Sequence, residues 1–194
     1  FIDFFGEWHE AIYIKGSGWD LATIEAAGFA PVRLDALIKL SQFKTLSDTD
    51  MVSAQRVSML DQNAPNPSVE AILHAIIPFR FVDHTHADAV VTLTNTPNGE
   101  ERIRTLYGNR VLVVPYVMPG FELARKIADL THKTDWSTLE AMVLMNHGIF
   151  TFADEASDSY ERMIRLVSEA EGILKKRLRA GIVNKEVPLL QLAE

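Results

Sequence analysis

Apolar positions along the chain follow two spacings, and each spacing predicts a different kind of element. Short apolar runs that end at glycine, proline or polar turns are typical of buried strands. Such runs, or segments that look extended, occur at residues 11–14, 81–86, 111–115, 141–145 and 149–152. The sequence therefore predicts short strands spread over the whole chain.

Apolar residues spaced three and four apart predict helices between these strands. Ser47 begins a polar segment that could cap one helix, and Pro67 suits the first turn of a helix that starts near Ser68. The predicted helical segments are residues 32–40, 51–60, 68–77, 121–130 and 160–174, with residues 89–91 continuing into another helix. Strands that alternate with helices predict an α/β fold in which helices cover the sheet.

The composition is that of one globular domain. The chain has 194 residues, 47% hydrophobic and 23% charged, so residues 1–194 are expected to form a single domain with a sizeable core. No run of roughly eighteen apolar residues is present, and we expect no membrane span. No signal-peptide pattern is visible. The composition suits the cytoplasm, and we expect that location. The chain begins with Phe1 rather than Met, close to a strand, so we expect that an N-terminal segment is missing.

Charge and cysteine content narrow the possible chemistry. The formal net charge of −7 argues against a nucleic-acid partner, because an acidic chain repels phosphate backbones. The densest basic run, residues 175–179, is interpreted as a solvated helix face. Cysteine is absent, which excludes disulfides, thiolate metal sites and cysteine nucleophiles. A metal site would therefore use histidine and carboxylate ligands.

Three histidines form a candidate metal site. His84 and His86 are two residues apart, and side chains at that spacing on a strand point to the same face. His147 lies at a break between two apolar segments, where Gly148 permits close approach of the backbone. Each histidine alone could be an incidental core, surface or turn residue. Together they supply three protein ligands and leave open positions, as catalytic zinc requires.

Glu70 lies in the first turn of the helix predicted to start near Ser68. A negative charge there interacts favourably with the helix dipole, which is one explanation for this residue. The other is a general acid/base or a further metal ligand. His74, one turn later, is either a group that orients the site or a half-buried helix residue.

A glycine-containing segment follows the first predicted strand and consists of Lys15, Gly16, Ser17 and Gly18. Backbone N–H groups, the serine hydroxyl and the lysine could cradle a phosphate there. The alternative is an ordinary turn. The segment is not a dinucleotide-binding fingerprint, because Leu21 stands where the third glycine is required.

In combination, these motifs resemble the class II aldolase and adducin head-domain family, from about Ile12 to Leu174. The segments that carry the resemblance are residues 13–18, 66–70, 83–89 and 144–148. Residues 18–25 and 113–120 are most similar to the aldolase part of bifunctional rhamnulose-1-phosphate aldolase/alcohol dehydrogenases, in which a short-chain dehydrogenase domain follows.

The resemblance implies a three-layer α/β/α sandwich on a largely antiparallel sheet, assembled as a homotetramer, with a small sugar phosphate as the substrate. It implies roles for the residues already singled out. The matching positions are the zinc ligands His84, His86 and His147, the acid/base Glu70, and the phosphate-binding Lys15, Gly16, Ser17, Gly18 and Ser68.

Two departures from the family pattern concern the same site. A Gly-Asn loop that the family places before the first strand, where it helps to hold phosphate, is absent from this chain. A catalytic tyrosine that small aldolases lend from a neighbouring subunit has no clear match, and Tyr107 is the candidate.

The implied activity is cleavage of a ketose 1-phosphate, similar to rhamnulose 1-phosphate, into dihydroxyacetone phosphate and an aldehyde. Zn²⁺ or another divalent metal would act as Lewis acid, and Glu70 would move the proton. One alternative is a pentulose-phosphate epimerase that uses the same metal site. Another is a non-catalytic scaffold like the adducin head, which predicts loss of the three histidines.

Overall fold

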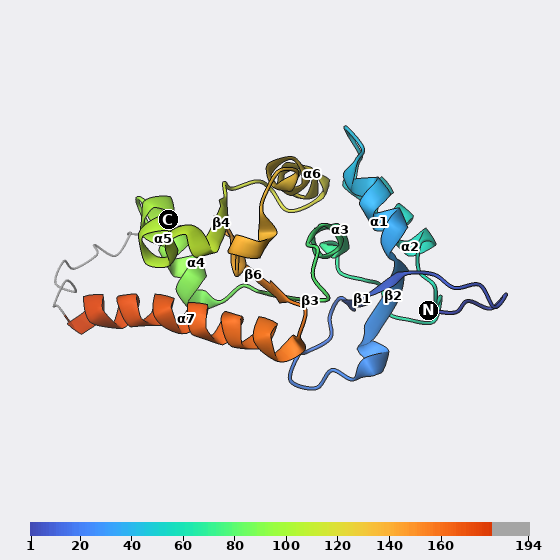
Figure 1. The fold of residues 1–194 in the computed structure, drawn as a ribbon, viewed down its shortest axis with the longest axis horizontal. Coiled ribbons are helices and arrows are strands. Elements are labelled where there is room, and N and C mark those ends of the chain that lie inside the picture. Colours follow the sequence, from blue (N-terminus) through green and yellow to red (C-terminus); the bar gives the residue numbers. More distant parts are fainter. Residues whose placement is uncertain (180–194) are drawn as a thin grey trace, which may run out of the picture. The chain divides into compact units, whose positions relative to one another are not determined.

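The computed structural model describes residues 1–179 and divides into two compact units (Figure 1). Unit 1 comprises residues 1–79 and 117–137, and the described part of unit 2 comprises residues 80–116 and 138–179. Each unit is therefore assembled from two separate parts of the sequence.

Unit 1 is built on a two-stranded antiparallel sheet with helices packed around it. Strands β1 and β2 pair so that Ile12 lies opposite Val32, and α3 packs against both α1 and α6. Buried apolar side chains such as Leu37, Ile72 and Phe121 fill the space between these helices. The elements are β1 Ala11–Lys15, η1 Ala26–Gly28, β2 Phe29–Arg33, α1 Leu34–Ser41, α2 Asp48–Val57, α3 Ala71–Ile76, α6 Phe121–Thr131 and, at the boundary, η3 Trp136–Thr138.

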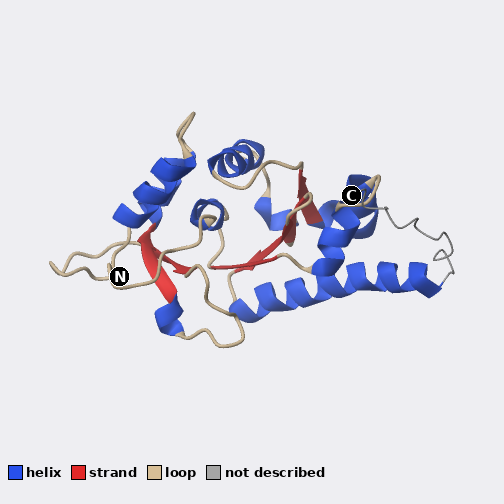
Figure 2. Cartoon of the chain, turned by 180° about the vertical axis from the view of Figure 1, so that it is seen from behind, coloured by secondary structure: helices blue, strands red, loops and turns tan. Residues whose placement is uncertain are grey.

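Unit 2 contains a four-stranded sheet in the order β3-β6-β5-β4. The long helix α7 runs beside β6 and β3, and α4 and α5 complete a core around Val90, Ile103 and Leu166 (Figures 1 and 2). The strands are β3 Phe81–Thr85, β4 Val111–Val114, β5 Ala141–Leu144 and β6 Gly148–Ala153. The helices are α4 Asp88–Thr94, α5 Gly99–Tyr107, η2 Gly108–Arg110 and α7 Ala156–Arg179.

The predicted α/β class is confirmed, and the sheet is mixed. Strands β3, β6 and β5 pair antiparallel, whereas β4 and β5 pair in parallel. Both β5 and β6 are buried along their whole length, which explains why they read as continuous apolar runs rather than as alternating patterns. Ser47 caps α2 as predicted, because its hydroxyl accepts a hydrogen bond from the Asp50 N–H at 3.1 Å.

Two predicted elements were wrong in position. Val32 belongs to β2 and not to a helix. Pro31 has no N–H to donate, and its carbonyl accepts from the Leu60 N–H at 2.9 Å on the side where Val32 bridges Met59. The helix expected near Ser68 begins at Ala71. Pro67 lies outside that helix and forms a β-bridge with Gly16, which keeps the chain extended before the helix can start.

Two further expectations concern the basic run at residues 175–179 and the absence of a membrane span. Lys175 and Lys176 are exposed on α7, as expected for a solvated face, whereas the side chains at residues 177–179 are outside the described part. Within residues 1–179, none of the helices combines the length and the apolar character needed to cross a membrane.

Candidate metal centre and phosphate segment

His84 is held in a fixed orientation by strand β6. Its ring stacks on Phe150, the residue opposite it in the sheet, with 4.0 Å between ring centroids and 15° between planes. The Nδ1 atom lies 3.0 Å from the backbone oxygen of Ile149. A neutral imidazole that donates from Nδ1 to this carbonyl carries its lone pair on Nε2, the tautomer that a metal ligand needs.

His86 and His147 reach the same point from two other places in unit 2. His86 follows the end of β3, and His147 lies in the tight turn between β5 and β6. Asn146 at this turn has a left-handed backbone with φ of 59°, and the His147 N–H donates to the Leu144 oxygen at 3.2 Å. The hairpin therefore presents His147 beside the end of β3.

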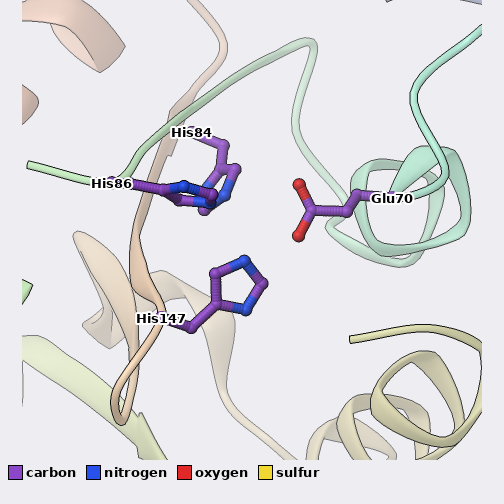
Figure 3. A group of neighbouring side chains, drawn as sticks. All are labelled: Glu70, His84, His86 and His147. Atoms are coloured by element: carbon purple, nitrogen blue, oxygen red, sulfur yellow. The ribbon is translucent and has the colours of Figure 1, made fainter. Parts of the chain in front are cut away.

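The three imidazoles lie together (Figure 3). The ring centroids are 4.9 Å apart for His84 and His86, 5.3 Å for His84 and His147, and 4.8 Å for His86 and His147. One ring nitrogen of each lies within 4.8 Å of those of the other two. The structure thus brings together all three histidines that the sequence singled out.

Gly148 makes this close arrangement possible. A Cβ atom added there would contact the backbone oxygen of Thr85 and would lie 3.1 Å from His84 Cε1 and 3.1 Å from His86 Cδ2. Only glycine fits against the two rings. Three imidazoles without thiolates suit Zn²⁺ and other borderline divalent metals, so the cluster could hold a divalent ion.

Residues of β3 that flank the histidines are fixed to α7, on the opposite face of the strand. The Ser159 hydroxyl donates to Asp83 Oδ2 at 2.6 Å, and the Thr85 hydroxyl donates to Met163 Sδ at 3.3 Å. Because side chains alternate along a strand, these contacts direct His84 away from the helix. Neither contact was predicted, because nothing in the local sequence marks Ser159 as the partner of Asp83.

A second connection supports the turn that carries His147. The side-chain amide of Asn146 donates to Asn95 Oδ1 at 2.7 Å, and the Asn95 amide donates to the Val91 oxygen at 2.9 Å. Asn95 is the residue that caps the C-terminus of α4, the helix that begins just after His86. One short helix therefore connects the segments that bear His86 and His147.

The predicted phosphate segment and Ser68 also lie together, within unit 1. The Ser17 N–H donates to the Asn66 oxygen at 3.0 Å, and the Ser68 N–H donates to the Lys15 oxygen at 3.2 Å. Ser17 and Gly18 form the turn after β1. Residues 15–17 and 66–68 thus run side by side as a short irregular pair.

Two backbone N–H groups of this segment bond within the protein. Those of Gly16 and Ser17 donate to the oxygens of Gly28 and Asn66. A Cβ on Gly16 would lie 2.6 Å from Pro65 Cγ, so this glycine serves close packing. Phosphate contacts would have to come from side chains, including the hydroxyls of Ser17 and Ser68.

Glu70 occupies the N-cap position of α3, in unit 1. Its N–H donates to the Ser68 hydroxyl oxygen at 3.3 Å, and its carbonyl accepts from the N–H groups of Leu73 and His74. The Glu70 side chain makes no capping hydrogen bond to its own helix. A carboxylate at this position can still interact favourably with the helix dipole, which requires no hydrogen bond. Figure 3 shows this side chain at the start of α3.

Tyr107 is part of the core and does not suit the catalytic role considered for it. Its side chain is 2% exposed, and its hydroxyl donates to the Leu166 oxygen at 2.8 Å. Burial raises the pKa of the Tyr107 hydroxyl above its ordinary value. A tyrosine lent to a neighbouring subunit must be accessible, and this one is enclosed by α5 and α7.

Comparison with known proteins identifies the family. The family model described as class II aldolase and adducin N-terminal domain matches residues 6–174, and the chain belongs to this family. A curated relative, called uncharacterized oxidoreductase YuxG of Bacillus subtilis (strain 168), is 36% identical over 176 residues, which cover 91% of this chain and 25% of the relative. The chain thus spans about a quarter of the length of that relative.

Solved structures support the same fold. The N-terminal class II aldolase domain of a conserved protein from Thermoplasma acidophilum matches with a TM-score of 0.81 and 36% identity, over 89% of this chain and 79% of that one. L-fuculose-1-phosphate aldolase from Thermus thermophilus matches with a TM-score of 0.54 and 18% identity, over 88% and 84% of the two chains. The predicted class II aldolase-like fold is therefore confirmed.

Proposed function

We propose that this chain is the metal-binding domain of an aldolase that cleaves a ketose 1-phosphate by a retro-aldol reaction. Membership of the class II aldolase family supports a sugar-phosphate aldolase or epimerase type of activity. L-fuculose-1-phosphate aldolase, named among the structural matches, acts on a compound of this class. The motif resemblance favours rhamnulose 1-phosphate or a similar ketose phosphate, giving dihydroxyacetone phosphate and an aldehyde.

The observation that carries this proposal is the convergence of His84, His86 and His147. A scaffold without catalytic activity, like the adducin head, would not need three imidazoles around one point or a glycine that makes room for them. The three histidines would hold Zn²⁺ or another divalent ion. The bound ion would supply Lewis-acid chemistry, stabilising the negative charge that develops on the substrate when the C3–C4 bond breaks.

The substrate phosphate would be bound by Lys15, Gly16, Ser17, Gly18 and Ser68. Because the backbone N–H groups of Gly16, Ser17 and Ser68 are already used within the protein, the hydroxyls and the lysine would make the contacts. The Ser68 oxygen accepts from Glu70, which leaves its O–H proton as a donor to phosphate. Lys15 donates to the Gly16 oxygen at 3.2 Å and has two further N–H donors.

Glu70 would move the proton to and from the three-carbon fragment. Only residues 77–80 connect α3, which begins after Glu70, to β3, which carries His84. The acid/base and the first metal ligand are thus carried by consecutive elements of the chain. No lysine that forms a Schiff base is required by this chemistry.

The proposal is tested by metal analysis of the purified protein together with an assay for dihydroxyacetone phosphate on a panel of ketose 1-phosphates. We expect about one divalent ion per chain, as three ligands predict, and release of dihydroxyacetone phosphate from at least one substrate. A protein that holds no metal after reconstitution with Zn²⁺, Mn²⁺ or Co²⁺ would refute the proposal. Interconversion of pentulose phosphates without release would identify an epimerase instead.

The wider organisation is also a proposal. We expect a homotetramer, a cytoplasmic location, a small sugar phosphate as the substrate, and no nucleic-acid or membrane partner. The relative from Bacillus subtilis is called an oxidoreductase, although this chain matches 25% of its length. A dehydrogenase domain fused in relatives would account for that name.

A further inference from the structure

Gln55 is a buried polar side chain that the proposed chemistry does not use. It lies on α2 in unit 1 and is 1% exposed, although glutamine is usually found at the surface. Its Nε2 donates to the backbone oxygen of Val69 at 3.1 Å. Burial of an amide costs free energy that a hydrogen bond must offset, so this contact explains why the amide is tolerated.

The accepting carbonyl belongs to the peptide that joins Val69 to Glu70. The Val69 side chain is 47% exposed, so the chain turns its apolar side chain outward and its carbonyl inward at this point. One residue earlier, the Ser68 hydroxyl accepts the Glu70 N–H. The backbone on both sides of this peptide is therefore held before α3 begins at Ala71.

The same loop, residues 66–70, is held from its other side by the phosphate segment. Ser17 donates to Asn66, Ser68 donates to Lys15, and Gly16 forms a bridge with Pro67. The loop thus lies between residues 15–17 and the buried amide of Gln55. A displacement of the Val69 carbonyl would shift the backbone of both Ser68 and Glu70, because each is a direct neighbour of Val69 in the chain.

We propose that Gln55 is a positioning residue, which fixes residues 66–70 in the shape that presents Ser68 to the substrate phosphate and Glu70 to the reacting carbon. The roles of Ser68 and Glu70 rest on the proposed function. The anchoring of the loop by Gln55 does not depend on it, and the two can be tested separately.

The first experiment compares Gln55→Met with Gln62→Met. Gln62 also donates its side-chain amide to a backbone oxygen in unit 1, that of Met59 at 3.0 Å, but it is exposed and lies outside the loop. We expect hydrogen exchange at the Ser17 and Ser68 amides to become about tenfold faster in Gln55→Met, since one net hydrogen bond is lost. Amides of α6 should keep their rates, and Gln62→Met should resemble the wild type.

The second experiment measures binding of inorganic phosphate and steady-state kinetics on the same variants. Gln55→Met should bind phosphate about tenfold more weakly, which corresponds to the loss of one net hydrogen bond. In the kinetic measurement kcat should fall and KM should rise, because the lost bond positions both Ser68 and Glu70. Equal acceleration of exchange throughout unit 1, with unchanged phosphate affinity, would show a merely structural role and overturn the proposal. If the wild type binds no phosphate, the phosphate assignment fails, whereas the exchange comparison still decides whether Gln55 anchors the loop.

If Gln55→Met does not fold, Gln55→Asn takes its place, because it keeps the amide and shortens the side chain by one carbon. In the wild type, NMR signals of the Gln55 side-chain amide should shift during a titration with inorganic phosphate, and those of Gln62 should not. Phosphate binding without any shift at Gln55 would overturn the proposal.

Discussion

The candidate metal site depends on the absence of a side chain at Gly148. A methyl group at this position would press against the Thr85 oxygen and the rings of His84 and His86. We predict that Gly148→Ala weakens Zn²⁺ binding by about 10–100-fold, the range found when groups that support metal ligands are changed. Isothermal titration of the metal-free protein with Zn²⁺ measures this directly.

Gly172 provides the matched control for that substitution. It lies within α7, and an added Cβ would meet nothing within 4 Å among the described residues. Gly172→Ala should leave Zn²⁺ affinity unchanged and raise the free energy of unfolding by about 0.5–1 kcal/mol, because alanine favours the helix. Equal Zn²⁺ affinities for the two alanine variants would contradict the packing argument.

Glu70→Gln separates the possible roles of this carboxylate. If Glu70 moves the proton, turnover should fall by roughly 10²–10⁴ with little change in stability. If it acted only through the helix dipole, the loss would be about 0.3–1 kcal/mol of stability with nearly intact turnover. The proposed function assigns the proton transfer to Glu70, so we expect the first result. Metal content must be measured on the same sample, since loss of metal would indicate that Glu70 is a ligand.

The histidines of the candidate site could be predicted from the sequence, whereas the contacts that orient them could not, and the difference has a physical reason. The pairing of His84 with His86 follows from strand spacing, and His147 beside Gly148 has a local signal as well. The contacts that orient them join residues far apart: Ser159 and Asp83 are 76 positions apart, and Asn146 and Asn95 are 51 apart. Without a recurring spacing, no pattern along the chain marks such partners.

At the scale of elements, the errors fall where tertiary contacts override local preference. Residues 68–70 look like the start of a helix, but the pairing of residues 66–68 with residues 15–17 delays α3 until Ala71. Helix α5, Gly99–Tyr107, was not predicted, because its charged first turns hide the buried positions Ile103 and Tyr107. The buried strands β5 and β6 and the amphipathic α7 were predicted, since their apolar patterns are long and uninterrupted.

An ion pair joins α7 to the end of η2, just before β4, and makes the stability of unit 2 depend on pH. Arg110 binds Glu169 through two hydrogen bonds of 3.1 and 2.7 Å. The hydrogen bond from Arg110 lowers the pKa of the Glu169 carboxyl below its ordinary value of 4.5. A lowered folded-state pKa means that the charged carboxylate stabilises the fold above pH 4.5. This contribution is lost as the pH falls below 4.5 through the lowered pKa.

We therefore predict that Glu169→Gln lowers the free energy of unfolding by about 1 kcal/mol at pH 7, a modest value because both side chains are partly exposed to screening solvent. The difference from the wild type should shrink as the pH is lowered below 4.5. Urea unfolding at several pH values measures it. Glu171→Gln, which breaks an exposed pair with Lys175, should cost only about 0.3 kcal/mol. If the loss of unfolding free energy in Glu169→Gln grew toward acid pH, the predicted direction of the pH dependence would be wrong.

At the scale of the whole molecule, the candidate chemistry is divided between the two compact units. The three histidines belong to unit 2, and the phosphate segment with Ser68 and Glu70 belongs to unit 1. Each set is brought together by contacts inside its own unit. In unit 2 the β5–β6 turn lies beside the end of β3, and in unit 1 residues 15–17 pair with residues 66–68. The proposed metal and phosphate contacts can therefore be tested by substitutions in different units.

Metal binding should be visible as stability of the folded chain. An ion that binds only the folded protein stabilises it by about 4 kcal/mol when its free concentration is about 1,000 times the dissociation constant. We predict that Zn²⁺ raises Tm and that a chelator reverses the rise. In His147→Ala the rise should be largely lost, because two imidazoles from one short segment remain. His132→Ala, which removes an exposed histidine at the end of α6, should respond to Zn²⁺ like the wild type. A Zn²⁺-dependent rise of the same size in His147→Ala would place the metal elsewhere and remove the basis of the proposed aldolase.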